Sequence, residues 1–99
     1  MSIDTSEKLK LMRESERLNR RQLSELTEIP YSSLSSYESG SKEISMKAVK
    51  KLFSVPQFSK YMMWFLTDKV APESGQIAPA LAHFGQENGD SFLSGQKIG

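Results

Sequence analysis

Residues 19–40 constrain the fold more than any other part of the sequence, because they predict two short helices joined by a tight turn. Asn19 can cap the first helix, with Gln22 completing a capping box. Pro30 disfavours helical backbone at the residue before it but suits the start of a new helix, and Gly40 provides a stop. Two helices connected in this way cross at a steep angle and pack closely. The apolar and small residues needed at the crossing are Leu23, Ser24, Ile29, Leu34 and Tyr37.

The segments on either side also predict helices. Apolar residues recur at helical spacing over residues 6–18, again from about residue 45, and over residues 57–67. After residue 69, recurring Pro and Gly residues argue against a long helix. The sequence therefore predicts an all-α, compact five-helix domain in residues 1–69, followed by an extended C-terminal segment in residues 70–99. A short β-strand in that segment is an open alternative, and residues from about 86 onward are expected to be mobile.

The second of the two short helices has an unusual outward face, formed by Tyr31, Ser32, Ser33, Ser35 and Ser36. Serine is a middling helix former, so four serines on a short helix gain nothing from propensity. A short, hydroxyl-rich face can enter a DNA major groove ~12 Å wide, where hydroxyls can contact donors or acceptors on base edges. Taken alone, the serines favour a loop. Within the two-helix frame of residues 19–40, they favour nucleic-acid recognition.

The charge is unevenly placed along the chain, although the net charge is only +1. Residues 1–69 hold twelve Lys and Arg against nine Asp and Glu, whereas residues 70–99 hold one against three. Basic residues concentrate over residues 8–21 and residues 42–51. Binding of a polyanion needs a basic surface rather than a basic total. Charge alone, however, fits ordinary solvated helix faces equally well.

Composition argues against several classes of protein. The chain has no cysteine, which excludes disulfides and thiolate-bound metals and favours a reducing intracellular compartment. No apolar run is long enough to span a membrane, and the first residues lack the form of a signal peptide, so we expect a cytoplasmic protein. The one histidine, His83, has no partner at catalytic or metal-ligand spacing. We therefore expect no enzyme activity, cofactor, metal site or small-molecule ligand.

The chain resembles a known family. The two-helix frame is that of the phage-repressor type of helix-turn-helix superfamily. The total length and the strings PYSSLSSYESG and PQFSKYMMWFLTDKVAPESGQIAPALAHFGQ are similar to those of the immunity C repressors of P2-like temperate coliphages. The resemblance covers essentially the whole chain. It implies a sequence-specific repressor that binds double-stranded operator DNA at the early lytic promoter and so maintains prophage lysogeny and immunity.

The resemblance also implies roles for individual residues. In phage repressors of this type, the positions of Tyr31, Ser32 and Ser36 face bases, with Ser33 close by. Phosphate contacts are expected at the start of the first short helix and beyond the end of the second, from Arg20, Arg21, Ser39 and Lys42. Arg13 and Glu38 fall at positions that form a partly buried ion pair, although a solvated Arg13 is the simpler alternative.

Glu28 departs from the family pattern. The superfamily usually has glycine at this turn position, because the backbone there is often left-handed. A glutamate in that conformation costs ~1 kcal/mol, and its charge is unhelpful near DNA. Two alternatives stay open, a strained left-handed glutamate or a turn of different shape.

The last predicted helix is too apolar to bury only one face, since a helix on a small core needs only a stripe. We therefore expect a homodimer formed by this helix and residues 74–84, in which a tail that crosses to the second subunit is an open alternative. The expected interface residues are Tyr61, Met62, Trp64, Phe65, Ile77, Leu81 and Phe84. A fully buried central helix is the alternative. The family's operators, arranged as direct repeats, fit a two-fold dimer only with flexibility or DNA bending.

A second function class fits the same apolar residues. An antitoxin-type interaction module with a helix-turn-helix could use them to bind a foreign protein instead of a second copy. The oligomeric state of the purified chain distinguishes the two functions, because a stable dimer favours the repressor.

Overall fold

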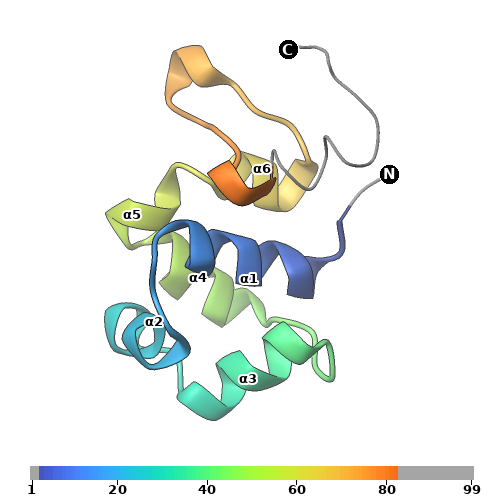
Figure 1. Ribbon diagram of the computed structural model, residues 1–99, viewed down its shortest axis with the longest axis vertical. Helices are drawn as coiled ribbons and strands as arrows, with labels where there is room; N and C mark the ends of the chain where they lie inside the picture. Colours follow the sequence, from blue (N-terminus) through green and yellow to red (C-terminus); the bar gives the residue numbers. More distant parts are fainter. Residues whose placement is uncertain (1–2, 83–99) are drawn as a thin grey trace.

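The computed structural model describes residues 3–82, which form a bundle of short helices (Figure 1). Its elements are α1 (Thr5–Ser15), α2 (Arg20–Thr27), α3 (Tyr31–Ser39), α4 (Met46–Phe53), α5 (Pro56–Ser59), α6 (Met62–Thr67) and the 3-10 helix η1 (Pro72–Ser74). The expected all-α class is confirmed. Among residues 3–82 the only extended pairing is an isolated bridge between Ala71 and Gln76, so the alternative of a β-strand finds no support there.

Polar side chains start the first helices as the sequence predicts. The Asp4 carboxylate accepts the backbone N–H of Glu7 at 3.0 Å, which lowers the pKa of Asp4, and the Ser6 hydroxyl adds to this effect. Asn19 and Gln22 form the expected capping box at α2, with distances of 2.8 and 2.9 Å. These bonds satisfy N–H groups that have no partner within the helix.

One core joins the six α-helices, α1 to α6. Its buried apolar members are Leu9, Met12, Leu23, Ile29, Leu34, Ala48, Leu52, Phe58, Tyr61, Trp64, Phe65, Ala78 and Ala82. Leu26, by contrast, is 42% exposed, although it lies one turn from the buried Leu23. The buried polar position on that turn of α2 belongs to Thr27, whose hydroxyl donates to the Leu23 carbonyl at 2.8 Å.

The single helix expected over residues 57–67 is two helices, α5 and α6, separated by Lys60 and Tyr61. This break changes the chain direction, so apolar residues on different sides of the segment reach the same core. Tyr61, Trp64 and Phe65 are only 3%, 2% and 6% exposed within one chain. Their assignment to a dimer interface is therefore wrong, because they pack inside their own subunit.

The segment that follows α6 folds back onto the same chain. The Gln76 amide accepts the Met63 N–H at 2.9 Å and donates to the Ser59 carbonyl at 3.0 Å. Further along, the Leu81 N–H donates to the Ser15 hydroxyl at 3.2 Å. Up to residue 82 the segment therefore contacts α1, α5 and α6 of its own chain. Phe84 and the tail from residue 86 lie outside the described residues.

Lys8 ties α1 to the end of α6, a role that the sequence did not indicate. Its ammonium donates to the carbonyls of Trp64 at 3.2 Å and Phe65 at 3.0 Å, and it pairs with Asp68 at 2.6 Å. Carbonyls at a helix C-terminus lack partners within the helix and attract cations. Lys8 thus belongs to the interior and not to a basic surface.

α2 and α3 lie at one end of the longest axis, whereas α6 and the segment after it lie at the other, with α1 between them (Figure 1). The fold therefore separates the serine-rich helix from the apolar residues of α6. No helix among residues 3–82 combines the length and apolar character that a membrane crossing requires.

Candidate nucleic-acid interface

The turn between α2 and α3 is held by both apolar and polar contacts. Leu23, Ile29 and Leu34 are 0%, 2% and 0% exposed, so these predicted crossing residues do lock the two helices together. Tyr37, also predicted, is half-buried and packs against the same core. Ser24, the small residue at the crossing, donates its hydroxyl to the Ile29 carbonyl at 2.7 Å. The Ile29 N–H in turn donates to the Thr27 hydroxyl at 3.3 Å. α3 therefore sits at a fixed angle to α2.

Glu28 takes the left-handed backbone, with φ 62° and ψ 25°. Of the two open alternatives, the structure thus has the strained glutamate and not a different turn. The Glu28 N–H donates to the Ser24 carbonyl at 2.8 Å, and the Glu28 carbonyl accepts the Lys51 ammonium at 3.1 Å. Lys51 therefore supports the turn from α4, which no sequence motif indicated.

α3 buries one side and leaves its hydroxyls free on the other. Leu34 and Glu38 are buried, Tyr31 and Ser32 are exposed, and Ser33 and Ser36 are half-buried. Within residues 3–82, the side-chain hydroxyls of Ser32, Ser33 and Ser36 make no hydrogen bond that would occupy them. Because hydroxyls both donate and accept, this face can meet either kind of group on a base edge.

The Ser36 carbonyl organises the chain after α3. It accepts the N–H groups of Ser41 at 3.1 Å and Lys42 at 3.3 Å, together with the Ser39 hydroxyl at 3.1 Å. These bonds follow the left-handed Gly40, with φ 82°, which ends the helix. Ser39 and Lys42 are both exposed beside the end of α3, where the resemblance places phosphate contacts.

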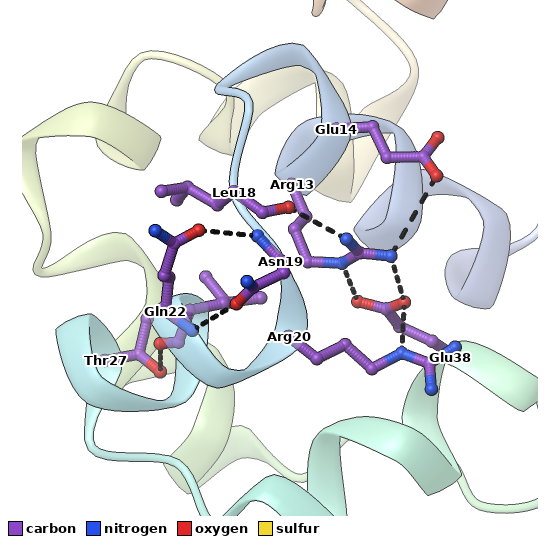
Figure 2. Close-up of polar contacts among 9 residues, drawn as sticks. Arg13, Glu14, Leu18, Asn19, Arg20, Gln22, Thr27 and Glu38 are labelled. Carbon is purple, nitrogen blue, oxygen red and sulfur yellow. Dashed lines mark hydrogen bonds and ion pairs between the residues drawn. The ribbon is translucent and has the colours of Figure 1, made fainter.

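A buried carboxylate joins the first three helices (Figure 2). The Glu38 side chain is 0% exposed and accepts Arg13 Nε at 2.8 Å, a second Arg13 nitrogen at 3.0 Å and Arg20 Nε at 3.1 Å. Arg13 also donates to the Leu18 carbonyl at 2.9 Å. The hydrogen bonds to Glu38 raise the pKa of Arg13. Arg13 thus forms the ion pair that the resemblance implied, and its side chain is not solvated.

Arg20 is both bound to Glu38 and partly exposed to solvent. Its Nε is bound to Glu38, yet the side chain is 38% exposed, so the rest of the guanidinium still faces solvent near α3. The sequence did not indicate that Glu38 would hold a second arginine. The neighbouring Arg21 is exposed and lies over the Tyr31 ring, with its guanidinium carbon 5.7 Å from the ring centroid. Adjacent arginines therefore have different partners.

A sequence model of the helix-turn-helix family matches residues 9–59, which run from α1 to α5 and include the whole α2–turn–α3 unit. The chain belongs to the helix-turn-helix family. Within this helix-turn-helix, the residues expected to contact DNA gather on and beside α3, whereas α6 and the segment after it lie beyond the matched part.

The similarity to a curated protein extends over those later residues as well. The chain is 54% identical to Repressor protein C of Escherichia phage P2 over 99 residues, which is the full length of both proteins. The match thus includes the apolar residues of α6 and residues 68–82, in addition to the helix-turn-helix. This finding agrees with the resemblance that the sequence motifs indicated.

Proposed function

We propose that the protein is a sequence-specific DNA-binding transcriptional repressor. It occupies an operator at the early lytic promoter and so maintains prophage lysogeny and immunity, acting in the cytoplasm of the bacterial host. The observation that carries the proposal is the free hydroxyl face of α3 in a helix-turn-helix whose chain is 54% identical, end to end, to a phage repressor. The proposal includes no catalytic step, cofactor, metal or small-molecule ligand.

In this proposal α3 lies in the major groove. Tyr31, Ser32, Ser33 and Ser36 contact base edges, because their polar side chains lie on the outward side of the helix. The groove is ~12 Å wide and admits one helix. Four residues at the start of α2 and at or beyond the end of α3 contact the phosphates and fix the register of α3: Arg20, Arg21, Ser39 and Lys42.

We also propose that the protein acts as a homodimer. One recognition helix contacts few base pairs, whereas two that are ~34–36 Å apart reach successive turns of the major groove. Large apolar side chains remain exposed on α6 and the segment after it: Met62, Leu66, Val70, Ile77 and Leu81. Exposed apolar side chains of this kind are typical of a protein–protein interface. A dimer that forms through them, at the end of the molecule away from α3, leaves the DNA-binding helix unobstructed.

Footprinting on prophage promoter DNA at two salt concentrations tests the repressor function. A protected site with defined edges, together with an affinity that falls as salt rises, is the expected result, because phosphate contacts release counterions. Uniform protection along the fragment, or no protection at the lower salt concentration, would contradict the proposal.

Substitutions distinguish residues that contact bases from residues that contact phosphates. Ser36→Ala should weaken binding to the protected site by about tenfold and leave binding to unrelated DNA almost unchanged, since it removes a base contact. Arg20→Ala should weaken both and reduce the salt slope by about 1. Lys69→Ala is the control, because this exposed lysine follows α6 at the far end of the molecule. Lys69→Ala should leave binding to both DNAs unchanged, and a Ser36→Ala variant that loses affinity equally for both DNAs would refute the division.

A further inference from the structure

Tyr31 is the one large side chain on the outward face of α3. It is the first residue of the helix and is 47% exposed, while the other polar residues of this face are serines. An exposed tyrosine can occupy several rotamers, and binding in a single rotamer costs conformational entropy. Whatever fixes the ring before DNA arrives therefore determines how well it contacts a base.

Arg21 supplies such a contact from the neighbouring helix. Its guanidinium carbon lies 5.7 Å from the centre of the Tyr31 ring, which is within the ~6 Å range of a cation–π interaction. The contact bridges α2 and α3 on the solvent side, away from the core residues that lock the two helices together. Approach of DNA displaces water from this pair, and a lower local dielectric strengthens the attraction.

Arg20, the residue before Arg21, does not contact the Tyr31 ring and so provides a comparison. Consecutive residues of a helix point about 100° apart, so the two arginines at the start of α2 face different neighbours. Arg20 donates to the buried Glu38 carboxylate at 3.1 Å, whereas Arg21 lies over Tyr31. The two residues have the same charge and adjacent positions but different partners, which makes Arg20 a matched control for Arg21.

We infer that Arg21 is a positioning residue for sequence specificity: it holds the Tyr31 ring in the orientation that contacts a base. The inference deepens the proposed function and rests on it. It differs from a phosphate contact in a measurable way, because a phosphate contact does not depend on the identity of residue 31.

A double-mutant cycle on DNA binding tests the inference. The probes are a duplex selected by the wild-type chain from a randomised library and a scrambled duplex of the same composition. Arg21→Met, which keeps a side chain of similar reach without the charge, should reduce the preference for the selected duplex about 3- to 10-fold. In a Tyr31→Ala background the same substitution should cause no further loss of preference. Arg21→Lys should restore part of the preference, since an ammonium group also binds a ring face.

Arg20→Met serves as the control for loss of charge. It should weaken binding to both duplexes by similar factors, and this loss should be the same with Tyr31 or Ala at position 31. If Arg21→Met behaves in that way too, Arg21 is a phosphate contact only and the inference is overturned. A wild-type chain that selects no preferred duplex would overturn the proposed function itself, and the inference with it.

A measurement on the protein without DNA tests directly whether Arg21 holds the Tyr31 ring in place. In NMR spectra of the free protein, the ring signals of Tyr31 should shift in Arg21→Met and stay in place in Arg20→Met, because only Arg21 lies over the ring. Unchanged Tyr31 signals in Arg21→Met would overturn the inference even if DNA binding were weakened. Equal urea midpoints for the two variants and the wild type would exclude a loss of folding as the cause of either result.

Discussion

At the scale of single residues, Glu28 holds a conformation that its side chain disfavours. Its left-handed backbone places Cβ close to the following carbonyl, which costs roughly 1–2 kcal/mol for a residue other than glycine. The bonds of its N–H to Ser24 and of its carbonyl to Lys51 keep this geometry in place. The strain is tolerated because the buried Ile29 and the crossing of α2 and α3 fix the turn on both sides.

We therefore expect Glu28→Gly to stabilise the protein. Glycine removes the strain but adds backbone freedom to the unfolded chain, which offsets roughly 0.5–1 kcal/mol of the gain. The net increase in the free energy of unfolding should be about 0.5–1 kcal/mol, or a rise in Tm of roughly 3–6 °C. Thermal unfolding followed by circular dichroism measures this change. Glu28→Ala keeps the Cβ and should leave Tm almost unchanged, so an equal rise in both variants would assign the effect to the charge instead.

At the scale of helices, α6 depends on a residue of α1. α6 has only six residues, and a helix this short is unstable without tertiary contacts. Lys8 satisfies two of its terminal carbonyls and lies 5.3 Å from the centre of the Trp64 ring. At the start of α6, the Tyr61 hydroxyl donates to the Glu16 carboxylate at 2.5 Å. Burial and this hydrogen bond raise the pKa of Tyr61. α1 is thus the element against which α6 is oriented.

Lys8→Met should lower the free energy of unfolding by about 1–3 kcal/mol, because it leaves the Phe65 carbonyl without its hydrogen-bond donor. The Trp64 carbonyl keeps the backbone N–H of Asp68 at 2.9 Å. Urea denaturation measures the loss. Lys10→Met is the matched control, since Lys10 is exposed on the same helix and should change stability by less than about 0.5 kcal/mol. Equal stabilities of the two variants would show that Lys8 does not hold α6.

At the scale of the whole molecule, opposite ends have different surfaces. The end with α2 and α3 presents hydroxyls, Arg20 and Arg21, whereas α6 exposes Met62 and Leu66, one turn apart and 43% and 56% exposed. Residues one turn apart lie on the same face of a helix. The arrangement suits a molecule that binds DNA at one end and a second copy of itself at the other.

Leu66→Glu should convert the proposed dimer to a monomer, because a carboxylate cannot be buried at an apolar interface without a partner. Multi-angle light scattering should give twice the chain mass of 11.2 kDa for the wild type and 11.2 kDa for the variant. Leu26→Glu, at an exposed leucine of α2, should remain dimeric. A monomeric or aggregated wild type would contradict the homodimer and favour a missing protein partner.

The sequence determined the local features of this protein. The capping box at Asn19, the helix start after Pro30 and the stop at Gly40 act through neighbouring residues, so their spacing predicted α2 and α3 closely. The burial of Leu23 and Leu34 followed from helical periodicity in the same way.

Only the tertiary structure decided which residues meet across the chain. Helical spacing could not reveal that the chain breaks between α5 and α6, which turns Trp64 and Phe65 from expected interface residues into core residues. Nor could it assign different partners to Lys8 and Arg20, because a basic side chain looks the same in sequence whether it meets solvent, a helix end or a buried carboxylate. These contacts depend on how helices distant in sequence pack, and packing is set by the whole core rather than by local propensity.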